Sequence, residues 1–268
     1  MKKKVIKISK IVLIVYCLVG IGLYHFQEKF LFHPEPVDVD FKYNFKGRTE
    51  EAFIPVNKYE QIHLVKFRPD TPSRGLILYF HGNMKNVSWY ESSARFFTQL
   101  GFEVWMHDYP GFGKTTGKLS EDKLYQHAMQ VRKLAGEKFS SDSIYLYGRS
   151  LGTGIAAYMA ANSENRSLIL ETPYSSIPSL FSHYAFMYPV GRMSIFKIPT
   201  SQFLEDVKEP ILILHGTKDR VIPLSEASKL RKVLKPGDKF IEIEGGGHND
   251  LGSNEKYKRA LQQWLKNP

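Results

Sequence analysis

The chain has 268 residues, of which 43% are hydrophobic and 24% are charged, an ordinary composition for a globular protein with a sizeable core. Its formal net charge is +10, which would suit a nucleic-acid partner, but five lysines within residues 1–10 account for half of it. The remaining charge is spread along the chain without an arginine-rich stripe, so we expect no nucleic-acid binding. A single cysteine, Cys17, excludes a disulfide framework and a cysteine metal site.

The first 26 residues predict a membrane segment. Residues 11–26 contain no Asp, Glu, Lys or Arg. As a helix, residues 5–26 would span ~33 Å at ~1.5 Å per residue, enough to cross the core of a bilayer. The lysines lie before this segment, so the positive-inside rule places the N-terminus in the cytoplasm and the rest of the chain outside. We therefore expect a single-pass signal anchor.

Two cleavage events are alternatives for this segment. A basic start and a short apolar core are also typical of a cleaved signal peptide, with a weak small-residue site at residues 20–22. Bulky Leu23 and Tyr24 would make an unusual mature N-terminus, so we favour the uncleaved anchor. Lipoprotein cleavage before Cys17 is disfavoured by the bulky Tyr16.

Beyond the anchor, the chain predicts one folded α/β domain. Residues 30–36 are punctuated by prolines and indicate a stiff linker at the membrane surface, so we assign residues 1–32 to anchor and linker and residues 33–268 to the domain. Runs of strand character lie at residues 52–56, 62–67, 75–80, 103–107, 143–147, 167–171, 211–215 and 239–243. Helical segments lie at residues 87–100, 121–137, 151–161, 225–234 and 255–265. This alternation predicts a mostly parallel sheet with helices on both faces.

One long irregular stretch, residues 173–209, interrupts this alternation. It is rich in aromatic residues and is broken by prolines. It can be a loop with short helices over the sheet edge, a small cap that forms an apolar wall above the site, or both. We expect Tyr174, Phe181 and Tyr184 of this stretch to line a substrate pocket.

The strand at residues 143–147 leads into G-R-S-L-G at residues 148–152, and a helix of small residues follows. The pattern G-x-S-x-G between a strand and a helix is typical of a nucleophile on a tight turn. Its glycines let the chain turn sharply and keep the Ser150 hydroxyl uncovered. The sequence therefore predicts Ser150 as a catalytic nucleophile.

A serine hydroxyl becomes a good nucleophile when a histidine accepts its proton and a carboxylate orients that histidine. In the chain order serine, acid, histidine, Asp219 is the candidate acid, because it lies on a turn just past the apolar run at residues 211–215. Glu171, at the end of another strand, is the alternative acid. His248 lies in a glycine-rich loop after the last strand and is the only histidine after Asp219, so we expect it to be the base.

Acyl transfer also needs N–H donors for the negative oxygen that develops in the transition state. We expect these to be the backbone N–H of Leu151, at the start of a helix, and that of Asn83, in the H-G-N loop after a buried strand. His81 belongs to the same loop but precedes the serine, and we expect it to be structural.

Other motifs are weak or missing. The turn D-Y-P-G-F-G at residues 108–113 places Tyr109 and Phe112 near the site, where they would line the acyl pocket or serve turn packing. The G-K-T at residues 113–115 lacks the glycine that a phosphate loop needs, and no H-E-x-x-H zinc spacing occurs. We therefore expect no metal and no cofactor.

Six motifs in the chain resemble those of the α/β-hydrolase superfamily. In order they are H-G-N, D-Y-P-G-F-G, G-R-S-L-G-T-G, E-T-P-Y-S-S, H-G-T-K-D-R-V-I-P and G-G-H. The chain is most similar to the membrane-anchored Bem46-like serine hydrolases, from about residue 30 to the C-terminus. The resemblance implies the α/β-hydrolase fold with an eight-stranded, mostly parallel sheet. It also implies Ser150 as nucleophile, His248 as base and Asp219 as orienting acid.

The residues and the resemblance together predict a serine hydrolase of the carboxylesterase, lipase or thioesterase type, acting through an acyl-enzyme intermediate. Its substrate would be a small-molecule or lipid acyl compound close to the membrane. A serine peptidase is one alternative. Another is a catalytically inactive, membrane-tethered hydrolase fold used for binding, which the intact set of Ser150, Asp219 and His248 disfavours.

Overall fold

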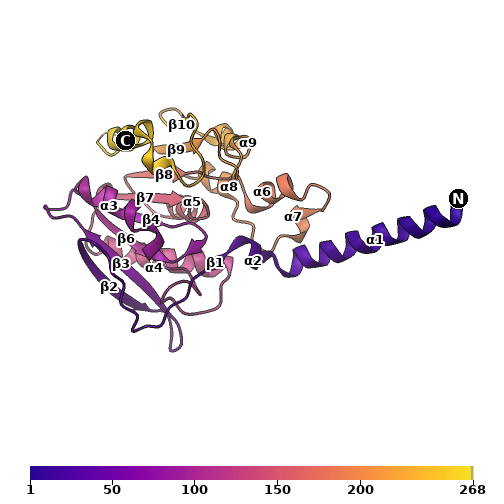
Figure 1. Ribbon diagram of the computed structural model, residues 1–268. Coiled ribbons are helices and arrows are strands. Elements are labelled where there is room, and N and C mark those ends of the chain that lie inside the picture. Colours follow the sequence, from indigo (N-terminus) through magenta and orange to yellow (C-terminus); the bar gives the residue numbers. More distant parts are fainter. Residues whose placement is uncertain (267) are drawn as a thin grey trace.

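The structure is a computed structural model and describes residues 1–266 and 268. At its centre is a sheet of eight strands (Figure 1). From edge to edge the strands are β10 (Lys239–Ile243), β9 (Ile211–Gly216), β8 (Ser167–Glu171), β7 (Ile144–Arg149), β4 (Leu76–Phe80), β6 (Glu103–His107), β3 (Gln61–Arg68) and β2 (Arg48–Pro55). Neighbouring strands are parallel, except that β3 runs antiparallel to both β6 and β2. The expected eight-stranded, mostly parallel sheet is confirmed.

Helices cover both faces of this sheet, as the sequence predicts. The four longest of the domain are α3 (Glu91–Gln99), α4 (Glu121–Gly136), α5 (Gly152–Asn162) and α10 (Glu255–Trp264). Helices α4 and α5 belong to one apolar core, and α3 and α10 belong to the other. All five residues of β4 are buried and alternate between these cores, with Leu78 in the first and Tyr79 in the second. A continuous apolar run is what a strand covered on both faces requires.

Two of the predicted helices are partly 3₁₀-helical. Residues 225–234 form α9 (Leu224–Ala227) followed by the 3₁₀-helix η3 (Ser228–Val233). Residues 87–100 begin with the 3₁₀-helix η1 (Val87–Tyr90) before α3. Short helices owe most of their stability to packing, so tertiary contacts that the local pattern does not contain decide their geometry.

The N-terminal segment forms the helix α1 (Lys2–His25), which projects from the domain (Figure 1). A second, short helix, α2 (Gln27–Leu31), follows it. None of the residues of α1 is buried. Within residues 1–266 and 268, α1 is the one helix that is long and apolar enough to cross a membrane. Its length and composition suit a membrane anchor and equally a signal sequence.

The expected linker at residues 30–36 is instead a docked part of the domain, which we call the N-terminal strap. Its strand β1 (His33–Pro34) pairs in parallel with β5 (Met84–Lys85). Leu31 and Phe32 are buried in the core. The linker prediction was wrong because two apolar side chains and a backbone ladder hold this stretch in place, despite its prolines.

Phe32→Ala is expected to lower the free energy of unfolding by about 3–5 kcal/mol, the range for truncating a buried phenylalanine. The Phe32 ring is 3% exposed, and its centroid lies 6.4 Å from that of Phe112 and 4.8 Å from that of Phe196. Urea unfolding of the full chain in detergent micelles measures the change. Phe186→Ala is the control, because the Phe186 ring is 80% exposed. Equal losses in the two variants would contradict a docked strap.

The insert at residues 173–209 contains three short helices. They are α6 (Ile177–Tyr184), α7 (Val190–Met193) and α8 (Thr200–Glu205). Figure 1 shows α6 and α7 at the end of the domain from which α1 departs. Helix α8 contacts α5, whereas α6 lines the cavity at Ser150. The insert therefore both covers the sheet and forms a wall of the site.

Candidate active site

Ser150 lies on the tight turn between β7 and α5. Its backbone φ of +51° is in the left-handed region, which a non-glycine residue adopts only where the surrounding structure imposes it. A Cβ atom on Gly152 would collide with the carbonyl oxygen of Phe80, and one on Gly148 would collide with that of Gly152. The two glycines of G-x-S-x-G are therefore needed for the helix to pass this close to the sheet.

The structure brings Ser150, Asp219 and His248 together. They lie on the connections that follow β7, β9 and β10, at the carboxyl end of the sheet. The Nε2 atom of His248 is 3.0 Å from the Ser150 hydroxyl oxygen, and its Nδ1 atom is 2.8 Å from a carboxylate oxygen of Asp219. With Nδ1 donating to the carboxylate, Nε2 can accept the serine proton.

Asp219 is held as a carboxylate. Its second oxygen accepts hydrogen bonds from the N–H groups of Val221 and Ile222, both at 2.8 Å. Burial raises the pKa of this carboxyl group, but the hydrogen bonds from His248 and from these N–H groups lower it further than burial raises it. The pKa of Asp219 therefore lies below its ordinary value, and the ionised group can orient and stabilise a cationic His248.

Glu171, the alternative acid, lies outside this arrangement. Its carboxylate accepts hydrogen bonds from the hydroxyls of Tyr147 and Tyr257 and lies 3.4 Å from the guanidinium of Arg149. Among the described residues, the carboxylate that bonds to His248 is that of Asp219. Glu171 belongs to a buried polar cluster behind the turn.

Arg149 connects that cluster to the site, and the sequence argument did not single it out. Its Nη2 atom donates to the side-chain oxygen of Asn249 at 3.2 Å, so it ties the serine turn to the loop that carries His248. Burial lowers the pKa of the guanidinium, but Glu171 and the nearby tyrosine hydroxyls together raise it by more, so the group stays charged. Its place as the variable residue before the serine in G-x-S-x-G was the only signal in the sequence.

Arg149→Met is expected to lower the free energy of unfolding by about 3–5 kcal/mol, the range for removing one partner of a buried ion pair. The side chains of Arg149 and Glu171 are only 15% and 4% exposed, so the variant leaves a buried carboxylate without its cation. Urea unfolding of the full chain in micelles measures the loss. Arg149→Met combined with Glu171→Gln should recover part of it, and a double variant no more stable than the single one would contradict the pairing.

The two candidate oxyanion donors line the same cavity as Ser150. Leu151 directly follows the serine, and Asn83 lies in the loop after β4. In the described part of the chain, neither of these N–H groups donates a hydrogen bond to the protein, so both are free for a substrate oxygen. The side-chain amide of Asn83 donates to the carbonyl oxygen of Leu31 at 2.8 Å, which fixes this loop to the N-terminal strap.

Hydrogen bonds that involve His81 and Tyr109 hold the loop after β4 in place. His81 is fully buried and donates from Nδ1 to the carbonyl oxygen of Gly82 at 2.7 Å, and burial lowers the pKa of its ring. The Tyr109 hydroxyl donates to the carbonyl oxygen of His81, also at 2.7 Å. His81 therefore has the structural surroundings that we expected.

A cavity of about 330 Å³ lies at Ser150. Its wall contains three expected residues, Tyr174, Phe181 and Tyr184. Sequence reasoning missed the remaining residues of the wall, which come from the strap, α6 and the loop after Asp219: Phe30, Leu31, Ile177, Leu180, Arg220, Val221 and Ile222. Together these side chains make the cavity predominantly apolar.

The pocket assignment was wrong for Tyr109 and Phe112. Both are fully buried, and neither lines the cavity at Ser150. The Phe32 ring of the strap packs against Phe112, and the Tyr109 ring lies 4.1 Å from that of His81. The strap covers the turn that carries Tyr109 and Phe112, so both side chains pack inside the domain instead of lining the cavity.

No group of three His, Cys, Asp or Glu side chains that could hold a metal ion is found within residues 1–266 and 268.

A family model described as serine aminopeptidase, S33, matches residues 71–203. The α/β hydrolase domain-containing protein 17C of Xenopus tropicalis is 29% identical over 205 residues, which cover 72% of this chain and 62% of the relative. The α/β hydrolase domain-containing protein aho-3 of Caenorhabditis elegans is 29% identical over 223 residues, covering 81% of this chain and 65% of that one. The chain belongs to the α/β-hydrolase superfamily. It spans under two thirds of the length of these relatives.

Solved structures agree on the fold of this α/β hydrolase. The esterase Pf2001 of Pyrococcus furiosus superposes with a TM-score of 0.69 at 16% identity, covering 88% of this chain and 97% of that one. The monoacylglycerol lipase of Paleococcus ferrophilus superposes with a TM-score of 0.59 at 20% identity, covering 76% and 98%. At these identities the likeness concerns the fold. The resemblance to membrane-anchored Bem46-like hydrolases fits the apolar N-terminal helix.

Proposed function

We propose that this α/β hydrolase is a serine hydrolase that cleaves acyl esters or thioesters through a covalent acyl-enzyme. The observation that carries the proposal is the hydrogen-bonded chain from Ser150 through His248 to Asp219. The three residues come from separate connections, and Ser150 has a left-handed backbone that its surroundings impose. Packing alone requires neither this backbone nor the order of serine, histidine and carboxylate.

In the proposed reaction, the Ser150 oxygen attacks the acyl carbonyl carbon while His248 Nε2 takes the hydroxyl proton. The carbonyl oxygen becomes negative and accepts hydrogen bonds from the N–H groups of Leu151 and Asn83. His248 then gives its proton to the leaving alcohol or thiol, which leaves the acyl group on Ser150. A water molecule then attacks the acyl carbon while His248 takes one of its protons. His248 returns that proton to the Ser150 oxygen as the carboxylic acid leaves.

The cavity favours an acyl substrate over a peptide. An aminopeptidase must hold the ammonium group of its substrate, and burial of that charge requires a carboxylate nearby. Among residues 1–266 and 268, the cavity wall contains no Asp or Glu, and its one charged residue is the cation Arg220. Residues 172–204 contain no acidic residue either. The names of the esterase and the lipase among the similar structures support the same substrate class.

For the location, we propose that α1 anchors the chain in a membrane, with the N-terminus in the cytoplasm and the catalytic domain outside. The five lysines at the start of α1 support this orientation.

A panel of substrates tests the proposed function. The full chain in micelles is assayed with p-nitrophenyl acetate, butyrate and octanoate, with an acetyl thioester, and with leucine p-nitroanilide. We expect hydrolysis of the esters and the thioester, and little of the anilide. Faster turnover of the anilide than of every ester would support the peptidase alternative, and no turnover of any compound would support the non-catalytic binding protein.

A further inference from the structure

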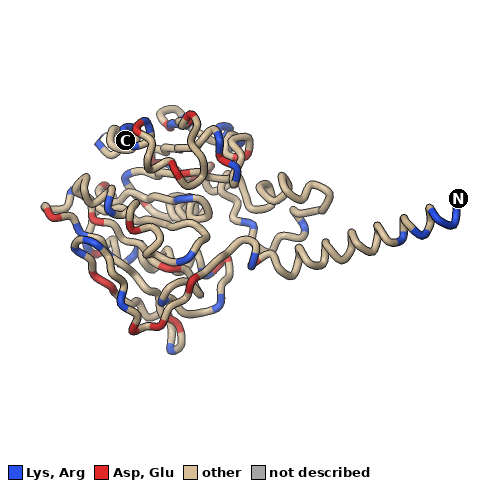
Figure 2. Tube along the Cα trace, in the orientation of Figure 1, with Lys and Arg blue, Asp and Glu red and all other residues tan. Residues whose placement is uncertain are grey.

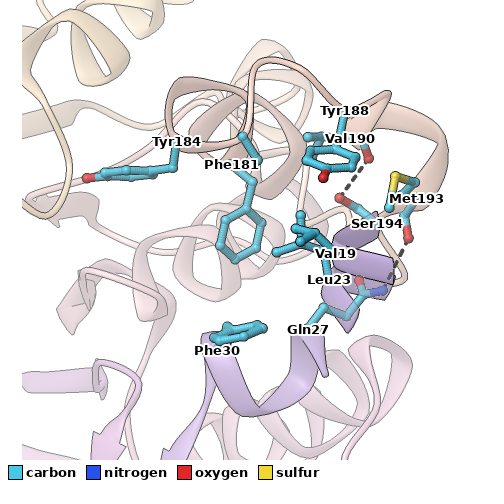
Figure 3. A pocket seen from close by; sticks show the side chains of 11 residues that line it. Val19, Leu23, Gln27, Phe30, Phe181, Tyr184, Tyr188, Val190, Met193 and Ser194 are labelled. Carbon is cyan, nitrogen blue, oxygen red and sulfur yellow. Dashed lines mark hydrogen bonds between the residues drawn. The ribbon is translucent and has the colours of Figure 1, made fainter. Parts of the chain in front are cut away.

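A second cavity, of about 400 Å³, lies between the N-terminal helices and the insert (Figure 3). Its wall is predominantly apolar. From α1 and α2 it takes Val19, Leu23, Gln27 and Phe30, and the insert contributes Phe181, Tyr184 and Ala185 among others. We call this cavity the anchor groove.

The helix wall of the anchor groove is one face of the N-terminal segment. Val19 and Leu23 are four residues apart in α1, so their side chains lie one above the other, and Gln27 at the start of α2 continues the wall. Figure 3 shows the side chains of Val19, Phe30 and Phe181 pointing toward one another across the groove. The groove is therefore built by an apolar face of α1 that meets the insert rather than by the insert alone.

Specific contacts hold α1 and the start of α2 against the insert. The rings of Tyr16 and Tyr188 stack with centroids 4.6 Å apart, and the Tyr16 hydroxyl donates to the carbonyl oxygen of Met187 at 2.8 Å. Gln27 donates to the carbonyl oxygen of Met193 at 3.2 Å and accepts from the N–H of Ile195 at 2.6 Å. These contacts set the width of the groove.

The anchor groove adjoins the cavity at Ser150. Phe30, Phe181 and Tyr184 line both cavities. These three side chains lie between the two cavities, so an apolar chain in the groove must pass them to bring its carbonyl end to the serine.

Exposed apolar side chains of the insert lie next to the N-terminal helices, because the backbone of Met187 and of Ile195 bonds to Tyr16 and Gln27. Phe186, Met187 and Ile195 of the insert are 80%, 66% and 60% exposed, which is unusual for apolar side chains unless a membrane or partner covers them. Residues 172–204 carry no acid and only Arg192 and Lys197 as cations. Figure 2 shows this scarcity of charge along the insert and most of α1. Such a surface suits the lipid interface.

We propose that the anchor groove binds the acyl chain of a lipid ester that enters sideways from the bilayer, so that its carbonyl carbon reaches Ser150. This inference rests on the proposed function, because it names the substrate of the same serine. The anchor helix is then a wall of the substrate site as well as a tether, and Phe30, Phe181 and Tyr184 form the constriction between lipid and serine.

The first test compares chain lengths in groove-filling variants. The full chain is reconstituted in phosphatidylcholine vesicles, and kcat/KM is measured with p-nitrophenyl palmitate and p-nitrophenyl acetate. Each methylene displaced from an apolar site costs about fourfold in binding, so Val19→Trp should lower the palmitate-to-acetate ratio about 15- to 60-fold if two or three are displaced. Ala185→Trp fills the groove from the side of the insert and should lower the palmitate-to-acetate ratio in the same way.

Ile21→Trp is the matched control, because Ile21 is exposed and does not line the groove. It should keep the wild-type ratio. Ratios in Val19→Trp and Ala185→Trp equal to that of Ile21→Trp would overturn the proposal. A wild-type chain that hydrolyses neither ester would instead contradict the proposed function.

A binding experiment separates the two claims. Ser150→Ala protein is placed in vesicles that contain a phosphatidylcholine with a diazirine at the end of one acyl chain, and is then irradiated. We expect crosslinks to residues 185–194 of the insert, which contribute to the groove but not to the cavity at Ser150. Adding Val19→Trp should lower them about tenfold or more. Crosslinks that are absent from residues 185–194, or unchanged by Val19→Trp, would overturn the groove proposal whatever the catalytic activity.

Discussion

Ser150→Ala is expected to lower kcat for ester hydrolysis by roughly 10⁴- to 10⁶-fold, the loss seen when the nucleophile of a serine hydrolase is removed. The alanine has no oxygen to attack the acyl carbon, and His248 loses the hydroxyl that lies 3.0 Å from its Nε2 atom. The residual rate would come from the oxyanion donors and from substrate binding. Steady-state turnover of p-nitrophenyl butyrate by the full chain in micelles measures the loss.

Ser182→Ala is the matched control for this experiment. Ser182 is an exposed serine of α6 whose hydroxyl donates to the carbonyl oxygen of Pro178, and it does not line the cavity at Ser150. It should retain the wild-type rate. A Ser150→Ala chain that keeps more than a tenth of the wild-type kcat would show that another group is the nucleophile.

Asp219→Asn is expected to lower kcat by about 10⁴-fold while leaving the backbone fold in place. An amide keeps an oxygen for the N–H groups of Val221 and Ile222, so the local turn can persist. It cannot stabilise a cationic His248, and its N–H₂ group favours the imidazole tautomer whose Nε2 carries the hydrogen and cannot accept the proton of Ser150. Turnover of p-nitrophenyl butyrate and the circular dichroism spectrum together separate lost chemistry from lost folding.

Glu171→Gln is the comparison that decides between the two acids. Glu171 bonds to Tyr147 and Tyr257 rather than to His248, so its amide variant should lose far less activity than Asp219→Asn. The opposite order, with Glu171→Gln the more damaging change, would make Glu171 the orienting acid and contradict the geometry at His248.

Sequence alone located the elements that position the candidate site. Five consecutive apolar residues in β4 and the G-x-S-x-G turn after β7 are local signals, because burial on both faces and a tight turn each restrict the residues allowed. Chain order then left His248 as the only histidine after Asp219. These local and ordered signals sufficed to name the three residues that the structure brings together.

The errors and omissions concern contacts between distant segments. Tyr109 and Phe112 were expected either to line the pocket or to serve turn packing, and the strap around Phe32 covers their turn, so only the packing role is found. The pairing of β1 with β5 joins segments about 50 residues apart, and no periodicity in either indicates the other. The anchor groove likewise needs α1 and an insert more than 150 residues later. Apolar composition shows that such segments bury surface but not which partner they meet.

The central claim, that Ser150 is an activated nucleophile, is tested most directly by a fluorophosphonate, which reacts covalently with the serine of such enzymes. The full chain is treated with the probe, and the labelled peptide is identified by mass spectrometry in wild type, Ser150→Ala and Ser182→Ala. The geometry of Ser150, His248 and Asp219 predicts one adduct, on Ser150, in wild type and in Ser182→Ala, and none in Ser150→Ala. No adduct on wild-type Ser150, or equal labelling of Ser150→Ala, would contradict it.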